Sequence, residues 1–151
     1  MKIINQNKKA KFLYFLGDSF QAGIVLKGSE VKSIRDGGIS LDQSYVTLDS
    51  NGELYLINCY IKPYKNTSSF AVEERRRRKL LLNKSEINKI SKHIKIKGGT
   101  VVPLKVFIND KGLVKVDIAI AKGKKNFEKN QASKDASREK EIKMMIKQMN
   151  I

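Results

Sequence analysis

The sequence predicts an all-β protein with short helices, a small antiparallel barrel or sandwich that continues into a basic tail. Three observations lead to this prediction. Apolar and polar residues alternate through several short segments, as they do in strands with one buried face. The clearest connections between these segments are short, which favours antiparallel pairing. The alternation stops after Ala121, and residues 122–135 contain only two apolar side chains, Phe127 and Ala132.

The N-terminal part of the chain contains the first of these segments. Residues 1–7 are expected to be frayed, and the aromatic and aliphatic run at residues 9–16 fits a first strand. A turn is expected at residues 17–19, which are glycine, aspartate and serine. Residues 20–28 alternate and fit a second strand, and residues 29–36 fit a short helix that ends at a pair of glycines.

Two hairpins and a second helix follow. Residues 45–57 alternate around an Asn-Gly turn, which is typical of a hairpin. Residues 62–79 show no period and predict a long loop, a feature that is usually functional or disordered in a small domain. Residues 83–97 predict a helix that begins with a capping box, and residues 101–121 predict a second hairpin. The total is about six strands and two short helices.

The charge of the chain points to a polyanionic partner. Lysine and arginine number 31 against 15 aspartates and glutamates, so the net charge is +16. Solubility alone needs a net charge of only about 2–8 in a small domain, and nucleic acid is the commonest intracellular polyanion. A membrane surface is the rival partner, but the sequence lacks a basic amphipathic anchor with bulky aromatic residues. No apolar run reaches the roughly 18 residues of a membrane span, and we expect a cytoplasmic protein.

The side chains that usually carry catalysis are scarce. One cysteine and one histidine exclude the usual zinc spacing, and no glycine-rich phosphate loop is present. Cys59 is expected to be a buried, inert thiol, and His93 a solvated helix residue. The sequence therefore predicts no enzyme, no metal and no cofactor. A metal-free ribonuclease with Glu30 as general base remains an alternative.

Basic residues gather in four clusters, at residues 8–11, 75–79, 92–97 and 122–125. Each cluster alone is compatible with a solvated surface, but the joint excess favours nucleic-acid binding, and arginines suit forked contacts to phosphate. Tyrosines are candidates for stacking on bases, although a tyrosine in a strand is more often half-buried packing. They are Tyr14, Tyr45, Tyr55, Tyr60 and Tyr64. A general single-strand binder or ribosomal-type protein remains an alternative.

Five motifs in order give the chain a resemblance to a known family. They are NKKAKFLYF (7–15), AGIVLKGSEVKSIRDG (22–37), RRRKLLLNKSEI (76–87), VVPLKVF (101–107) and VKVDIAIAKGKK (114–125). With these motifs the chain resembles the small protein B family, the tmRNA-binding proteins of bacterial trans-translation, also called SsrA-binding proteins. The resemblance implies an oligonucleotide-binding (OB)-like barrel of six antiparallel strands over residues 1–121. It also implies a basic tail over residues 122–151, disordered when free and helical on the ribosome.

The resemblance further implies a non-enzymatic adaptor. Such a protein binds the tRNA-like domain of tmRNA and delivers it to stalled ribosomes, where its tail senses the empty mRNA channel. The implied partners are tmRNA and the ribosomal RNA of the decoding centre and mRNA channel, and the implied state is a monomer. Replacing Glu30 with alanine is expected to spare the fold and to weaken specific RNA binding.

The family's functional positions map onto this sequence residue by residue. The implied RNA-binding residues are Asn7, Lys8, Lys9, Glu30, Lys32, Arg35, Arg76, Arg78, Lys79, Gly123, Lys124 and Lys125. The implied ribosome-binding tail residues are Phe127, Glu128, Lys129, Lys134, Arg138, Ile142, Lys143 and Met144. In the tail, Glu128-Lys129-Asn130 stands where family members often carry Asp-Lys-Arg, so one cation is missing.

Overall fold

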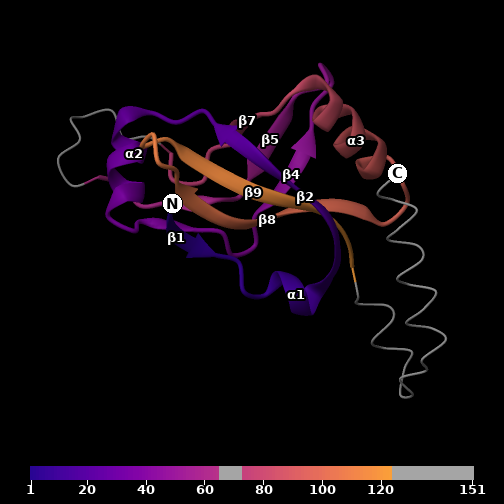
Figure 1. Cartoon of the computed structure of the whole chain (residues 1–151), viewed down its shortest axis with the longest axis horizontal. Helices are drawn as coiled ribbons and strands as arrows, with labels where there is room; N and C mark the ends of the chain where they lie inside the picture. Colours follow the sequence, from indigo (N-terminus) through magenta and orange to yellow (C-terminus); the bar gives the residue numbers. More distant parts are fainter. Residues whose placement is uncertain (65–72, 124–151) are drawn as a thin grey trace.

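Antiparallel strands make up most of the computed structural model, which describes residues 1–64 and 73–123 (Figure 1). The strands in these ranges are β1 (Lys2–Gln6), β2 (Tyr14–Ile24), β3 (Ile39–Ser40), β4 (Tyr45–Leu48), β5 (Leu54–Ile57), β6 (Tyr60–Ile61), β7 (Arg78–Leu81), β8 (Gly99–Ile108) and β9 (Val114–Gly123). The helices are α1 (Ala10–Leu13), α2 (Gly28–Arg35) and α3 (Lys84–Ile94). The predicted all-β class with short helices is confirmed.

The main sheet has seven strands in the order β1-β8-β9-β2-β7-β5-β4, and β3 and β6 form a small second sheet. Every pairing among the described strands is antiparallel. The sheet curls so that β4 packs against β8, yet the ladder has two ends and does not close within the described ranges. The fold is therefore an open barrel with one strand more in its main sheet than the six that were predicted.

The core is the concave side of this curled sheet, capped by α3. Alternate side chains of β8 and β9, such as Val106 and Ile118, are fully buried there. Burial of apolar surface stabilises such a core by roughly 25 cal/mol per Å². The predicted capping box of α3 is confirmed, because Asn83 Oδ1 accepts from the backbone of Glu86 at 2.9 Å and the Glu86 carboxylate accepts from the backbone of Asn83 at 3.2 Å.

The predictions for the N-terminal residues are wrong in three places. Residues 1–7 are not frayed, because β1 pairs with β8 from Lys2↔Ile108 to Gln6↔Lys105. The expected strand at residues 9–16 begins instead with α1, since a short apolar run has no period that separates helix from strand. The expected turn at residues 17–19 is a continuation of β2, whose register against β9 shifts there, as at a β-bulge.

Two further boundaries differ from the predictions. The loop expected at residues 62–79 ends early, because Arg78 begins strand β7, which joins β2 to β5. Strand β9 continues to Gly123, two residues beyond the expected boundary at Ala121. Both predicted hairpins are confirmed as β4–β5 and β8–β9. No helix within the described residues is long and apolar enough to span a membrane.

His93 is buried, so the prediction of a solvated helix residue is wrong. Its side chain is 1% exposed, and Nε2 lies 2.8 Å from the carbonyl oxygen of Ala121 near the end of β9. A histidine can replace an apolar residue on the inner face of a helix when its ring nitrogen finds a backbone partner. This contact ties the C-terminal half of α3 to the end of β9.

Candidate nucleic-acid interface

The structure gathers one group of predicted RNA-binding residues around the end of β9. Asn7, Lys8 and Lys9 form the connection between β1 and α1, and α1 leads directly into β2. The first residue of β2, Tyr14, pairs with Gly123, the last residue of β9. The chain therefore leaves β9 towards residues 124–151 beside the start of β2. Lys124, Lys125 and all the predicted tail positions lie outside the described residues.

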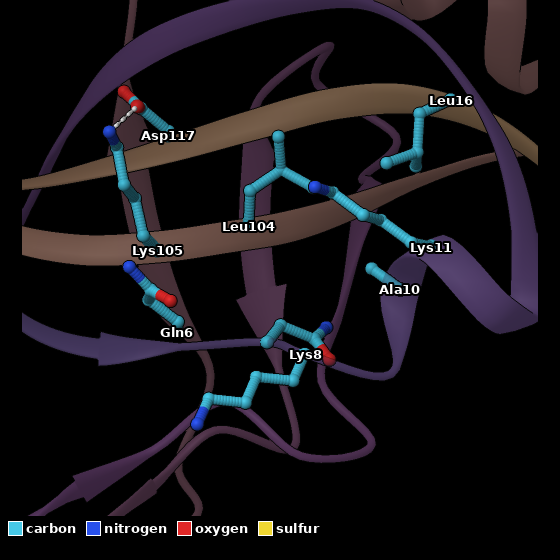
Figure 2. A pocket seen from close by; sticks show the side chains of 9 residues that line it. Gln6, Lys8, Ala10, Lys11, Leu16, Leu104, Lys105 and Asp117 are labelled. Atoms are coloured by element: carbon cyan, nitrogen blue, oxygen red, sulfur yellow. Dashed lines mark ion pairs between the residues drawn. The ribbon is translucent and has the colours of Figure 1, made fainter.

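A cavity of about 420 Å³ lies beside this connection. Its lining combines the apolar side chains of Ala10, Leu16 and Leu104 with amide and charged groups, which belong to Gln6, Asn7, Lys8, Lys11, Lys105 and Asp117. Figure 2 shows Lys11 extending from α1 across the cavity, while Lys8 extends on the other side and Lys105 points at Asp117. The Lys105 ammonium and the Asp117 carboxylate are 3.5 Å apart. The cavity thus has one charge-compensated wall, and its other wall carries the exposed Lys8.

Asn7 fixes the path of the connection. Its side-chain amide donates to the carbonyl oxygen of Pro103 at 3.0 Å, and its backbone N–H donates to Leu104 at 2.8 Å. These bonds extend the attachment of β1 to β8 by one residue and set the direction in which Lys8 and Lys9 leave the sheet. Both lysines are exposed. Asn7 therefore positions the cations that follow it.

A second group of predicted residues lies at the opposite end of β9. Lys32 and Arg35 are exposed on α2, and the Lys32 ammonium lies 5.6 Å from the ring centroid of Tyr64. Arg35 lines a shallow pocket together with Leu113 and Val114 at the start of β9. Ten residues of strand separate this end from Gly123, which corresponds to about 30 Å. Figure 1 shows α2 and the end of β9 on opposite sides of the molecule.

Glu30 is the centre of a buried ionic cluster and not an exposed RNA contact. Its side chain is 3% exposed and accepts from the backbone N–H of Lys27 at 2.9 Å, which satisfies a free donor at the start of α2. The Arg76 guanidinium forms an ion pair with Glu30 Oε1, and Arg78 Nε donates to Oε2 at 2.7 Å. The carboxylate thus joins α2 to the segment that enters β7.

Arg78 is wholly enclosed by acceptors. It is 0% exposed and donates to the carbonyl oxygens of Cys59 at 2.8 Å and of Arg76 and Glu74 at 3.1 Å. Such complete satisfaction is what allows a charged side chain to be buried. Arg78 therefore acts inside the fold. The side chain of Arg76 is 25% exposed, and Lys79 forms an ion pair with Glu53 at 3.2 Å.

The environment of Glu30 keeps its carboxylate ionised. Burial raises its pKa, but the hydrogen bonds from Arg76, from the backbone of Lys27 and from Arg78 outweigh burial and hold the pKa below its ordinary value.

Burial raises the pKa of the Cys59 thiol to about 11, and Cys59 is fully enclosed, which confirms the prediction of a buried, inert thiol.

These contacts argue against the ribonuclease alternative. A general base must reach the proton that it removes, and Glu30 is occupied by two arginines beneath the surface. His93 is enclosed between α3 and β9. Among the described residues no three histidine, cysteine or carboxylate side chains gather as metal ligands would.

Two of the four consecutive arginines face inward, and the other two are exposed. Arg76 and Arg78 turn inward to Glu30, whereas Arg75 and Arg77 are exposed. The family resemblance implied RNA contacts for Arg76 and Arg78, whereas Arg75 and Arg77 were predicted only as members of the basic cluster at residues 75–79. A strand alternates its side chains between two faces, so the buried Leu80 indicates that Arg78, two residues earlier in β7, shares the inner face. Lys11 was predicted only as part of the basic cluster at residues 8–11, and Lys105 was missed, because the cavity that both line joins distant segments.

The fold and the site together define a small, basic, open β-barrel whose exposed cations gather where its strands begin and end. That arrangement is typical of nucleic-acid-binding modules. The model of the SmpB protein family matches residues 4–148 of this chain. The chain therefore belongs to the SmpB family, and the resemblance seen in the sequence is confirmed.

Relatives and a solved structure agree with this assignment. An SsrA-binding protein of Parvibaculum lavamentivorans is 46% identical over 147 residues, which cover 97% of this chain and 89% of the relative. An SsrA-binding protein of Rickettsia bellii is also 46% identical and covers 97% of both chains. A chain of the structure described as "tmRNA-SmpB: a journey to the center of the bacterial ribosome" is 40% identical, with a TM-score of 0.66 and 86% of each chain covered.

Proposed function

We propose that this chain is a non-enzymatic adaptor that binds the tRNA-like domain of tmRNA and delivers it to stalled ribosomes. The observation that carries the proposal is the group of exposed cations, Lys8 and Lys9, held by Asn7 beside the end of β9. Family membership supports it, because relatives at 46% identity are SsrA-binding proteins and a related chain belongs to a tmRNA–SmpB structure. The proposed adaptor works as a monomer in the cytoplasm.

The proposal divides the work between the folded part and the tail. The β1–α1 connection and the exposed side of α2 hold the structured RNA, with Lys32 and Arg35 at the second end of the sheet. The tail follows the empty mRNA channel, a polyanionic passage, and its predicted residues read whether message is absent. The tail begins beside the RNA-holding cations, since β9 ends next to the start of β2.

The double substitution Lys8→Ala, Lys9→Ala tests the first part of this proposal. We expect the affinity for a tRNA-like RNA to fall by about tenfold or more, and the salt dependence of binding to weaken by about two units of slope, because two phosphate contacts are lost. Filter binding at several salt concentrations measures both quantities.

Lys84→Ala with Lys89→Ala is the matched control, because it removes the same charge from exposed positions on α3. Its affinity is expected to stay close to that of the unmodified chain. Equal losses in the two variants would mean that only net charge matters. An unmodified chain that binds unstructured RNA of the same length as tightly as tRNA-like RNA would favour the general single-strand binder instead.

Removal of residues 126–151 tests the tail. This truncation preserves all of β9 and the predicted contacts of Gly123, Lys124 and Lys125. Binding of the tRNA-like RNA is expected to survive within about threefold, a difference below 1 kcal/mol, while tagging of peptides on stalled ribosomes is lost. A reconstituted translation assay with a truncated message measures tagging. Full tagging by the shortened protein would remove the sensing role from the tail.

A further inference from the structure

One outer face of the sheet combines aromatic side chains with arginines. On strands β4, β5 and β7 the inward positions are buried, as at Val46, Leu56 and Leu80. The register pairs Thr47 with Tyr55, and Tyr55 with Lys79, so these side chains follow one another across the opposite face. Tyr45, 41% exposed, belongs to the same face because it is two residues from Thr47.

Arg75 and Arg77 extend over the tyrosines of this region. The Arg77 guanidinium carbon lies 4.3 Å from the ring centroid of Tyr55, and that of Arg75 lies 5.5 Å from the ring centroid of Tyr60. The Arg75 guanidinium also donates to the backbone oxygen and side-chain oxygen of Asn58, both at 3.1 Å. Each guanidinium therefore lies within cation–π distance of an aromatic ring, and Arg75 is further held by Asn58.

The buried Glu30 cluster fixes the two arginines that alternate with Arg75 and Arg77. Arg76 and Arg78 are fixed to Glu30 on the inner side. Arg77, which lies between them, is exposed, and so is Arg75 in the turn that precedes them. The Glu53 carboxylate already accepts from the Tyr55 hydroxyl at 3.2 Å and pairs with Lys79. The Glu73 carboxylate accepts from the backbone N–H of Arg75 at 3.1 Å. Within the described residues neither Arg75 nor Arg77 forms an ion pair.

We propose that Tyr45, Tyr55, Tyr60, Arg75 and Arg77 form a second RNA-binding surface that takes unpaired nucleotides. Guanidinium planes and aromatic rings are the groups on which splayed bases stack in proteins that bind single-stranded RNA. An arginine that lies flat on a ring offers its outer side to a base and its edge to a phosphate oxygen. Stacking tolerates every base, so we expect this surface to bind unpaired RNA without strong sequence preference.

This surface is separate from the one proposed for the tRNA-like RNA. None of its five residues lines the cavity beside the Asn7–Lys9 connection. The inference therefore adds a second surface to the proposed function and does not depend on it.

The test uses the full-length chain and a fluorescein-labelled dodecauridylate, an RNA without secondary structure. Arg75→Ser with Arg77→Ser is expected to weaken binding by about tenfold or more, because alanine substitutions of stacking groups cost about 1–3 kcal/mol per base. The charge-matched control, Lys2→Ser with Lys111→Ser, removes two exposed cations elsewhere and is expected to change the affinity by no more than about threefold. Fluorescence anisotropy at two salt concentrations measures both.

The salt series separates stacking from bulk charge. The gap between the two double variants is expected to persist at high salt, since stacking is not screened. Equal weakening of both variants, or a gap that vanishes at high salt, overturns the inference. Tyr55→Leu is expected to weaken binding about tenfold and Tyr55→Phe less than about twofold. If neither tyrosine variant changes the affinity, the surface is not a stacking platform and a protein partner replaces RNA as the candidate.

The experiment distinguishes a failure of this inference from a failure of the proposed function. Binding of tRNA-like RNA is measured in parallel with Arg75→Ser, Arg77→Ser and with Lys8→Ala, Lys9→Ala. A chain that prefers tRNA-like RNA but whose dodecauridylate affinity ignores Arg75 and Arg77 overturns only the inference. A chain without that preference, whose dodecauridylate affinity falls with Arg75 and Arg77, overturns only the proposed function.

Discussion

Glu30→Ala is expected to lower the free energy of unfolding by about 3 kcal/mol or more. The substitution leaves Arg78, which is 0% exposed, as a buried cation without its carboxylate. Loss of one partner of a buried ion pair typically costs about 3–5 kcal/mol, because the remaining charge cannot be rehydrated. Arg76 is partly exposed and regains water, which places the expectation at the lower end of that range. Urea denaturation followed by circular dichroism measures the change.

Glu86→Ala is the matched control for this substitution. Glu86 is the third residue of α3 and accepts from the backbone N–H of the residue that precedes the helix, as Glu30 does in α2, but it forms no ion pair within the described residues. Loss of a capping contact costs about 1 kcal/mol. If Glu30→Ala were no more destabilising than Glu86→Ala, the buried cluster would contribute little to the fold. The sequence-based expectation that Glu30→Ala spares the fold would then return.

The same cluster predicts a pH dependence. The pKa of Glu30 is lowered from its ordinary value of 4.5 in the folded protein, so the folded state binds the carboxylate's proton less readily than the unfolded state does. The stability that this group contributes is complete above pH 4.5 and is lost as the pH falls through the lowered pKa. The difference in unfolding free energy between the unmodified chain and Glu30→Gln should therefore shrink below pH 4.5. A difference that stays constant from pH 7 to pH 3 would contradict the argument.

Gly99→Ala is the second substitution with a large expected effect. A β-carbon at this position would lie 2.1 Å from the backbone oxygen of His93 and 3.0 Å from that of Ile96. Both contacts are with backbone, so the end of α3 must move away from β8. Forced overpacking costs about 1–3 kcal/mol and occasionally more, and we expect about 3 kcal/mol here because no side chain can rotate to relieve it.

Gly99→Ala is also expected to disturb the buried contact of His93. A shift of the α3 terminus also strains the contact between His93 Nε2 and Ala121. Gly28→Ala is the control, since nothing lies within 4 Å of the added β-carbon at the first residue of α2. Its stability is expected to be unchanged or to rise by up to about 1 kcal/mol. Thermal and urea unfolding of both variants, followed by circular dichroism, compare them directly, and equal stabilities would contradict the close approach of α3 and β8.

Local patterns explain which parts of the fold were predictable. The hairpins β4–β5 and β8–β9 carry both alternation and turn residues within a few positions, and α3 carries its own capping box. By contrast, β1 is a mostly polar segment whose partner, β8, is about a hundred residues away. Long-range pairing of that kind leaves no local pattern, so frayed residues were expected in its place.

The candidate site was predictable as composition but not as orientation. The exposed Lys8 and Lys9 belong to a cluster that the sequence already marked as basic, whereas the exposed Lys32 and Arg35 were implied only by the family resemblance. Which of the arginines face inward was not predicted. Residues 75–79 were assigned to a loop, and only a strand at β7 fixes which side chains turn inward. Glu30 was expected to face RNA because the cluster that buries it joins residues 46 and 48 positions apart in sequence.

The exit of the chain from β9 has a mechanical consequence. β9 lies between β8 and β2, and its last residues pair with both neighbours, at Gly99↔Lys122 and Tyr14↔Gly123. A force applied to the chain beyond Gly123 along the strand axis would act on two hydrogen-bond ladders at once. It would not break the hydrogen bonds of β9 one after another. A pull on the C-terminal segment is therefore transmitted to the whole sheet, which can follow as a rigid body instead of unravelling.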